Sequence, residues 1–494
     1  MQVASLVHNK GQDAFSGTDP AHAWKTLDRV NRTIFTAGDR ILFQAGGRFP
    51  GQLAPHGSGK EGAAIIVDAY GDGAKPLIEA AGSYPEALLL KNREYWEVNN
   101  LELTNTGLIR WKHRYGVRLQ AFDFGTLHHI VLRNLFVHDV NGWLVKGRGE
   151  GHGIVWENGG KTLRSRFDGL LIENCRLLRT DRNGICGRSE NDTRNNWFPS
   201  PNVVIRNNDL EDIGGDSIKP FGCEGALVEH NRVRKAGQRC PDYSAGIWPW
   251  SCDRTLIQFN EVSFFHGTRD GQAFDSDGNC RDTVFQYNYS HDNDGGFLMM
   301  CDDGAWSAPE SLGNRGTVVR YNLSQNDRAR IFHLTGPIND ARTYNNVIYI
   351  GKELNLPLFL FTDYHGFPDG IYIANNIFYV AGKCRYSQGI SRHWNGSYED
   401  TPGWGGTKNI RFEANAYFGT HANPPEDARA VRGQPMLVHP GSGGEGFATV
   451  DGYQLREGSP CIRAGVRVPD SPSRDFWGHP IPPDAAPDIR VHQR

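Results

Sequence analysis

Short runs of alternating apolar and polar residues recur along most of this chain, and many of them end in Asn. The matching runs end at Asn100, Asn134, Asn174, Asn207, Asn231, Asn260, Asn288, Asn322, Asn345 and Asn375. Their separations of 23 to 40 residues suit one coil of three short strands and three turns, with insertions in the longer coils. Because strand residues alternate faces, one apolar side chain in two would point into a shared core. The pattern predicts a solenoid of stacked parallel strands.

The Asn at the end of each run has a structural explanation. Asn tolerates left-handed backbone, and its side chain can hydrogen-bond to the same residue one coil away, about 4.8 Å distant. We therefore expect a ladder of Asn side chains along the stack, with a structural role.

A second strand follows each of these runs, and its outward positions collect polar and aromatic residues. We set the phase of each strand by its first inward apolar residue, at Ile154, Ile185, Ile218, Ile247 and Phe274. The solvent-facing positions then become Val155 and Glu157, Cys186 and Arg188, Lys219 and Phe221, Trp248 and Trp250, and Asp275 and Asp277. These strands are predicted to form one sheet that faces a ligand.

The two ends of the chain depart from the repeat. Trp24, Leu27, Val30 and Ile34 recur at helical spacing within residues 20–34, which predicts a cap helix over the open end of the solenoid. From about residue 421 the repeat fades into a tail rich in Pro and Gly. We expect a cap region at 1–60, coils with the active-site cleft at 61–420, and a tail packed on the last coils at 421–494.

Composition narrows the possible partners. The chain is 38% hydrophobic and has no apolar run of about 18 residues, so no membrane crossing is expected. A net charge of -3 gives no basic field for nucleic acid. The nine cysteines are odd in number and lack C-x-x-C spacing, which excludes a typical zinc site or dense disulfide frame and favours free, buried thiols. We expect a monomer.

The start of the chain carries no charged segment followed by an apolar one, as a signal peptide would. Since the rest of the chain is typical of an exported polysaccharide-active protein, we expect that Met1 replaces a removed signal peptide. The predicted location is secreted or periplasmic.

The two ends resemble a known group of proteins. SGTDPAHAWKTLDRVN, AGDRILFQAGGRFPGQLAPHGSGKEG and AYGDGAKPLI at the start, with GSPCIRAG and RDFWG at the end, are similar to bacterial right-handed parallel β-helix proteins of the pectate-lyase-like superfamily. The chain looks most similar to the glycoside hydrolases of family 141, which include α-fucosidases and xylanases, and more distantly to β-helix lyases. The resemblance implies an all-β, right-handed parallel β-helix that binds glycan across one outer sheet.

The same resemblance implies cleavage by acidic residues, or by a Lys or Arg base, on that sheet. A full catalytic motif of the family does not map onto the chain. The polygalacturonase motifs are absent in their usual order, because Gly151, His152 and Gly153 precede the acidic cluster here.

Paired aspartates supply the candidate chemistry. Glycosidic cleavage needs an acid and a second carboxylate that acts as base or nucleophile, and the carboxyl separation decides the stereochemical outcome. Asp275 and Asp277 are two residues apart on one strand, about 6.5 to 7 Å at the backbone, which favours inversion. Asp302 or Asp303, one coil away, could instead approach Asp275 at about 5 Å, as retention requires. A polar turn or a calcium site is the structural alternative.

Further residues on the same face are predicted to bind substrate. Trp248 and Trp250 could stack on sugar rings, while Lys219 and Arg188 could hold a carboxylate or form salt bridges to Asp275 or Glu157. Glu157, His333 and, on neighbouring coils, His291 and the group Asp363, Tyr364 and His365 could line subsites.

Three functions fit these residues. The first is a secreted glycoside hydrolase that needs no cofactor and acts on a plant, algal or microbial polysaccharide or oligosaccharide. The second is a polysaccharide lyase or epimerase, with Lys219 or Arg188 as base and Ca²⁺ held by Asp275, Asp277 and Asp303. The third is a solenoid that binds glycan without catalysis.

Overall fold

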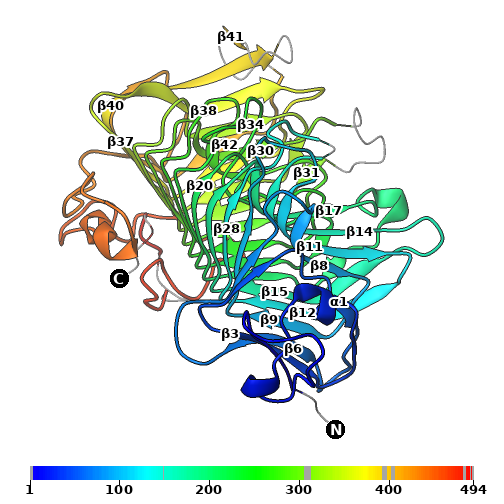
Figure 1. The fold of residues 1–494 in the computed structure, drawn as a ribbon. Coiled ribbons are helices and arrows are strands. Elements are labelled where there is room, and N and C mark those ends of the chain that lie inside the picture. The colour runs from blue at the N-terminus through cyan, green and yellow to red at the C-terminus, as the bar shows by residue number, and fades with distance from the viewer. Residues whose placement is uncertain are drawn as a thin grey trace. The chain divides into compact units, whose positions relative to one another are not determined.

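The chain folds as an all-β right-handed parallel β-helix, as the sequence predicts (Figure 1). The computed structural model describes residues 4–147, 149–304, 313–391, 398–401, 406–481, 486–489 and 491. These form two compact units, which are described separately. Unit 1 holds residues 1–192, 196–227 and 235–243, and unit 2 holds residues 193–195, 228–234 and 244–494. The division falls within β23 (Leu227–Glu229).

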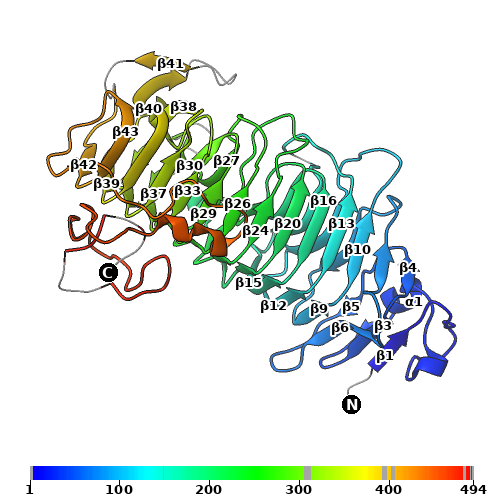
Figure 2. The same ribbon diagram turned by 90° about the vertical axis from the view of Figure 1, so that its left-hand side faces the viewer.

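Unit 1 contains three parallel sheets, seen as the blue to green strands of Figures 1 and 2. The first contains β1 (Ala4–Val7), β3 (Arg40–Gln44), β6 (Ile65–Tyr70), β9 (Trp96–Asn99), β12 (Thr126–Arg133), β15 (Arg166–Glu173) and β19 (Val204–Arg206). The second contains β4 (Arg48–Pro50), β7 (Leu77–Glu79), β10 (Glu102–Asn105), β13 (Phe136–Val140), β16 (Arg176–Thr180) and β20 (Asp209–Ile213). The third contains β8 (Glu86–Lys91), β11 (Tyr115–Phe122), β14 (His152–Gly159), β17 (Asn183–Ser189) and β21 (Ile218–Lys219).

Unit 2 repeats the three-sheet arrangement. The first sheet contains β25 (Leu256–Gln258), β28 (Val284–Gln286), β32 (Val318–Arg320), β36 (Arg342–Tyr344), β39 (Tyr372–Ala374) and β42 (Arg411–Glu413). The second contains β24 (Arg232–Arg234), β26 (Glu261–Ser263), β29 (Tyr289–His291), β33 (Leu323–Gln325), β37 (Val347–Ile350), β40 (Ile377–Ser391), β43 (Ala416–Ala422) and β44 (Val431–Arg432). The third contains β27 (Gln272–Ser276), β30 (Gly296–Cys301), β34 (Phe332–Thr335) and β38 (Asn355–Asp363), which pairs with the second part of β40.

Short elements complete the chain. They are the two-stranded pairs β2 (Ile34–Phe35) with β5 (His56–Gly57), β18 (Ser200–Pro201) with β22 (Cys223–Glu224), and β31 (Asn314–Arg315) with β35 (Ile338–Asn339), then β41 (Tyr398–Thr401), the 3₁₀ turns Pro20–His22, Arg194–Asn196 and Phe447–Tyr453, and the helix α1 (Leu27–Asn31). The predicted helix over 20–34 is thus one short helix that buries Leu27 and Val30. Ile34 lies in β2 and is 76% exposed, so its predicted place in the cap helix was wrong.

The predicted strand phase is confirmed within each unit. Ile154, Ile185 and Ile218 are paired across β14, β17 and β21 and are fully buried. In unit 2, Ile247 pairs with Phe274, which in turn pairs with Leu298. Stacking the same apolar position coil upon coil removes it from water, and this hydrophobic burial is the main stabilising term of such a solenoid.

The predicted Asn ladder is present in unit 2. Side-chain amides at Asn231, Asn260, Asn288, Asn322, Asn346, Asn376 and Asn415 each donate to the next, at 2.9 to 3.0 Å, until Asn415 donates to Asp427. Asn345 and Asn375 precede the ladder by one residue and adopt left-handed backbone instead. Asn375 also donates to Asn345 at 3.3 Å, so left-handed backbone and a hydrogen bond one coil away are both present there, as predicted, and a second ladder runs beside them. Aromatic residues also occupy the left-handed position that precedes the ladder. Phe259 and Tyr287 both adopt it, and their rings stack with centroids 4.9 Å apart.

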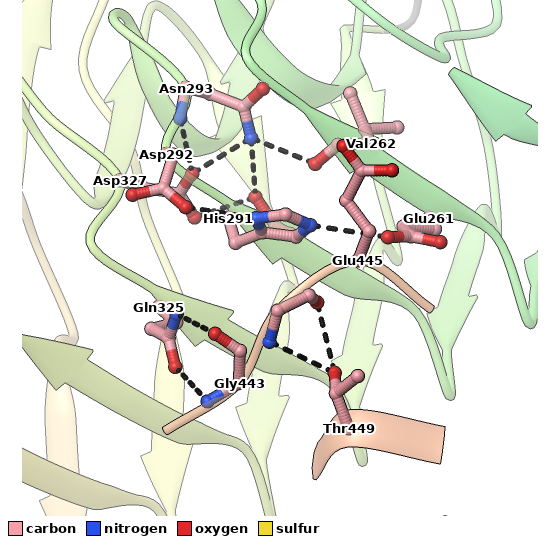
Figure 3. Close-up of polar contacts among 12 residues, drawn as sticks. Glu261, Val262, His291, Asp292, Asn293, Gln325, Asp327, Gly443, Glu445 and Thr449 are labelled. Carbon is pink, nitrogen blue, oxygen red and sulfur yellow. Dashed lines mark hydrogen bonds and ion pairs between the residues drawn. The ribbon is translucent and has the colours of Figure 1, made fainter. Parts of the chain in front are cut away.

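The tail of unit 2 is held on the second sheet of that unit (Figure 3). Gln325 exchanges two hydrogen bonds with the backbone of Gly443, at 2.9 and 2.8 Å, and the amide of Gly446 donates to Glu261 at 2.7 Å. His291 lies between Glu261 and Asp292, 3.2 and 2.9 Å from their carboxylate oxygens. Burial acts to lower the pKa of His291, but these two hydrogen bonds outweigh it and raise the pKa to about 9. His291 is thus a structural cation, and its predicted subsite role was wrong.

In the described part of the chain, which contains all nine cysteines, none is recorded in a disulfide, and seven of the nine are buried, as the sequence predicts. In the part of the chain that the structure describes, no helix has the length and apolar character needed to span a membrane.

Candidate functional site

The predicted site residues divide between the two units. Glu157, Arg188 and Lys219 belong to unit 1, and Trp248, Trp250, Asp275, Asp277, Asp303 and His333 belong to unit 2. Each group is therefore described within its own unit.

Asp275 and Asp277 lie on either side of Ser276, the last residue of β27. Ser276, between them, is fully buried and its hydroxyl lies 3.0 Å from that of Thr317, which leads into the first sheet. Because neighbouring residues of a strand alternate faces, Asp275 projects from the opposite face, and Asp277 directly follows the end of β27. Asp275 is nevertheless only 2% exposed, while Asp277 is half-buried.

Four carboxylates lie within electrostatic range of Cys301 at the end of β30. Enclosure by protein raises the pKa of the Cys301 thiol well above its usual range, and the charges of Asp277, Asp275, Asp270 and Asp302 raise it further. An electrostatic effect of this kind requires the charges to be near the thiol. These four aspartates are called the acidic cluster below. It contains the predicted pair and adds Asp270, which precedes β27 and was missed because it lies outside the alternating pattern.

The two aspartates after β30 have different surroundings. Asp302 is 1% exposed, and its carboxylate accepts from the backbone amides of Asn279 at 2.8 Å and Gly304 at 2.7 Å. This bonding holds two turns in place, which is a structural role. Asp303 is half-buried. Its catalytic role stays a prediction.

The two tryptophans differ from the sequence prediction. Trp248 is 3% exposed, so its prediction as a solvent-facing stacking residue was wrong. The alternating pattern of the strand cannot reveal that this outward position is covered. Trp250 is half-buried, and its ring packs over Gly278, where an added Cβ would lie 3.2 Å from a ring atom.

His333 is also covered. Its Nε2 atom lies 2.9 Å from the hydroxyl of Thr362, and burial, together with the charge of Arg330, lowers its pKa well below the ordinary value. A neutral, buried imidazole of this kind cannot be a surface subsite, so that prediction was wrong. Arg330 instead fixes the loop before β27, because its guanidinium donates to the carbonyl oxygen of Asp270 at 3.0 Å.

The unit 1 residues form salt bridges. Glu157 accepts from Arg118 at 2.7 Å, and Arg118 also pairs with Glu86 at 2.8 Å. Arg188 pairs with Glu150 at 3.2 Å, so the ion-pair alternative considered for this Arg holds, with Glu150 as partner. Lys219 is 5% exposed, and its ammonium lies 5.5 Å from the centre of the Phe221 ring.

Sequence reasoning missed the partner of Arg188, because Glu150 precedes its strand. Burial acts to raise the pKa of Glu150, but the charges of Lys219, Arg188 and Arg182 outweigh it and hold the pKa below the ordinary value. Glu150 is therefore a buried carboxylate that is balanced by cations.

The metal-ligand geometry and the cavities of the described residues do not mark the predicted site residues. Among the described residues, no three His, Cys, Asp or Glu side chains are grouped as a metal site requires. Cavities of about 410 Å³ beside Tyr95 and His129 and about 690 Å³ beside Arg281 and Arg315 lie elsewhere. The acidic cluster is therefore identified by its four carboxylates.

Comparison with known proteins shows that the chain is similar to two lacto-N-biosidases, among other proteins. A lacto-N-biosidase of Bifidobacterium longum subsp. longum is 29% identical over 590 aligned residues, which cover 95% of this chain and 35% of the relative. The crystal structure of GH136 lacto-N-biosidase from Eubacterium ramulus superposes with a TM-score of 0.62 at 28% identity, and covers 72% of this chain and 65% of that chain. This chain therefore spans about a third of the length of the curated relative. No family model matches it.

Proposed function

We propose that this chain is a glycoside hydrolase that acts on an oligosaccharide. The acidic cluster on the outward face of unit 2 carries the proposal, because glycosidic cleavage needs two carboxyl groups in reach of one bond. The similarity to two lacto-N-biosidases supports it, since both are glycoside-cleaving by name.

The proposed mechanism uses Asp275 and Asp277. Asp275 is the more buried of the two, and burial beside other carboxylates favours the neutral acid, which suits a proton donor to the leaving oxygen. Asp277 is half-buried and acts as base or nucleophile. Asp270, whose loop is fixed by Arg330, is a third carboxylate that could replace Asp275 as the acid.

The proposed substrate class follows the relatives: an oligosaccharide of the kind that a lacto-N-biosidase cleaves. Secretion, the resemblance to family 141, and the cap, coil and tail regions at 1–60, 61–420 and 421–494 stay predictions. Activity on fucosides or xylans would favour the family 141 resemblance over the lacto-N-biosidase one.

A panel of oligosaccharides and polysaccharides tests the proposal. A hydrolase is expected to release reducing sugars without new ultraviolet absorbance, and to keep its activity in EDTA. Products that carry a conjugated double bond, or loss of activity in EDTA, would favour the calcium-dependent lyase instead. Binding without any product would favour the non-catalytic solenoid.

A further inference from the structure

Unit 1 encloses a group of polar atoms that lack hydrogen-bond partners. His152, Arg182 and Asn183 are fully buried at the start of β14 and β17. Nonetheless, Nε2 of His152, Nε and Nη1 of Arg182, and Oδ1 of Asn183 have no hydrogen-bond partner among the residues that the structure describes. Buried polar atoms are nearly always paired, with protein or with another molecule. A concentration of unpaired ones therefore marks a place built for a polar guest.

The carboxylate of Glu150 lies at the centre of this group. Its Oε1 atom is 3.9 Å from His152 Nε2, and its Oε2 atom is 3.7 Å from Arg182 Nε. Both distances exceed a hydrogen bond, but an oxygen about 2.8 Å from each partner would bridge them at roughly a right angle. The two gaps thus offer two positions for bridging oxygens, one at each carboxylate oxygen.

The protonation states of these residues define what the guest must be. Burial lowers the pKa of His152 well below its ordinary value, with help from Arg188, Lys219 and Arg182, so the ring is neutral and can donate or accept. Arg182 donates only, whereas the Glu150 carboxylate and Asn183 Oδ1 accept only. A hydroxyl group both donates and accepts, and so matches this mixture.

The charges of the group are already compensated. Arg182 pairs with Asp242 at 3.0 Å, and Glu150 is surrounded by the cations of Arg182, Arg188 and Lys219. An ionic guest would leave one of these charges unbalanced in a buried place. The chemistry therefore favours a neutral guest with adjacent hydroxyl groups.

We propose that Glu150, His152, Arg182 and Asn183 form a subsite that binds neighbouring hydroxyl groups of a sugar. Arg188, which pairs with Glu150 at 3.2 Å, is the partly exposed neighbour of this group, since 31% of its side chain is exposed. The inference rests on the proposed function only in taking the hydroxylated guest to be a sugar. The role proposed for these four residues is the binding of substrate.

Binding measured without turnover tests the subsite. In an Asp277→Asn background, calorimetry with the best oligosaccharide of the panel is expected to show about ten-fold or greater loss of affinity in His152→Gln and in Glu150→Gln, since each removes one partner of a bridging oxygen. His138→Gln is the matched control, because this His pairs with Glu102 at 2.9 Å in the second sheet and is expected to keep the affinity. Circular dichroism identifies any variant that fails to fold, and Glu150→Gln then serves in place of His152→Gln.

Unchanged affinity in both folded variants would overturn the subsite, and so would a crystal structure with oligosaccharide in which these atoms hold only ordered water. The two proposals fail separately. Binding that depends on His152 without any cleavage by the unmodified protein would remove the hydrolase and keep the subsite. Cleavage by the unmodified protein, together with unaltered affinity in the variants, would keep the hydrolase and remove the subsite.

Discussion

The hydroxyl of Ser276 lies 3.0 Å from the hydroxyl of Thr317 in the interior of unit 2. This contact fixes which way β27 faces, because Asp275, next to Ser276 on the strand, must point outward. The proposed chemistry of Asp275 and Asp277 depends on that orientation. A shift of one residue in the register would exchange the two faces and turn Asp275 into the core.

Trp248 and Trp250 are expected to respond differently to truncation. Trp248 is 3% exposed, so Trp248→Ala should lower the free energy of unfolding by about 3–5 kcal/mol through the cavity that it leaves. Trp250 is half-buried, so Trp250→Ala should mainly raise KM. Urea unfolding and steady-state kinetics measure the two effects. Equal losses of stability in both variants would contradict this difference.

The ion pairs of His291 with Glu261 and Asp292 predict that the free energy of unfolding falls at alkaline pH. The pKa of this His is raised to about 9 in the folded protein and is about 6.5 in an unfolded chain. The protonated His therefore stabilises the fold by up to about 3 kcal/mol. This contribution is complete below about pH 6.5 and is lost as the pH rises through about 9. Urea unfolding between pH 6 and pH 10 should show this decline. His291→Gln should abolish it, and a variant with an unchanged pH profile would refute the assignment.

Asp327 predicts a second decline in stability with rising pH, in the acidic range. It is fully buried and accepts hydrogen bonds from Ser290, Ser324 and Asn293, yet burial, the largest effect, raises its pKa to about 6. Because the folded protein binds this proton more tightly than the unfolded chain, stability should fall as the pH rises from about 4 to about 6. Comparing unfolding of the natural protein with Asp327→Asn over this range measures the contribution. A difference that stays constant with pH would exclude it.

The Asn ladder predicts a large cost for one amide. Asn288 accepts from the backbone and the side chain of Asn260 and donates to Asn322, all at 3.0 Å. Asn288→Ala should lower the free energy of unfolding by about 3–5 kcal/mol, because several buried groups lose their partner. Asn134 is exposed and left-handed, so Asn134→Gly is the control and should cost less than about 1 kcal/mol. Similar costs at both positions would contradict a structural ladder.

The repeat made most of the fold predictable. Apolar residues that recur once per coil set the phase of the strands, and Ile185 with Ile218 and Ile247 with Phe274 pair as that phase requires. Two neighbouring asparagines remained ambiguous, since either Asn345 or Asn346 fits a ladder by sequence. The backbone decides, because the first of the two turns the corner in the left-handed region.

The site was less predictable for a physical reason. Alternation shows which face a residue takes, but not whether another segment covers that face. Trp248 and His333 both project outward and are both covered. Glu150 and Asp270 lie before their strands, where no period applies, and their places depend on contacts with Arg188 and Arg330 that only the folded chain reveals.

The turnover of carboxylate variants tests the central proposal most directly. Asp275→Asn, Asp277→Asn and Asp270→Asn would be assayed on the best oligosaccharide of the panel, with product configuration read by NMR. Asp340→Asn is the control, because Asp340 is an exposed carboxylate that pairs with Arg315 at 3.0 Å. We expect kcat to fall by about a thousand-fold or more in Asp277→Asn and in one of the other two cluster variants, and to stay unchanged in Asp340→Asn. Near-normal turnover in all three cluster variants would contradict the account.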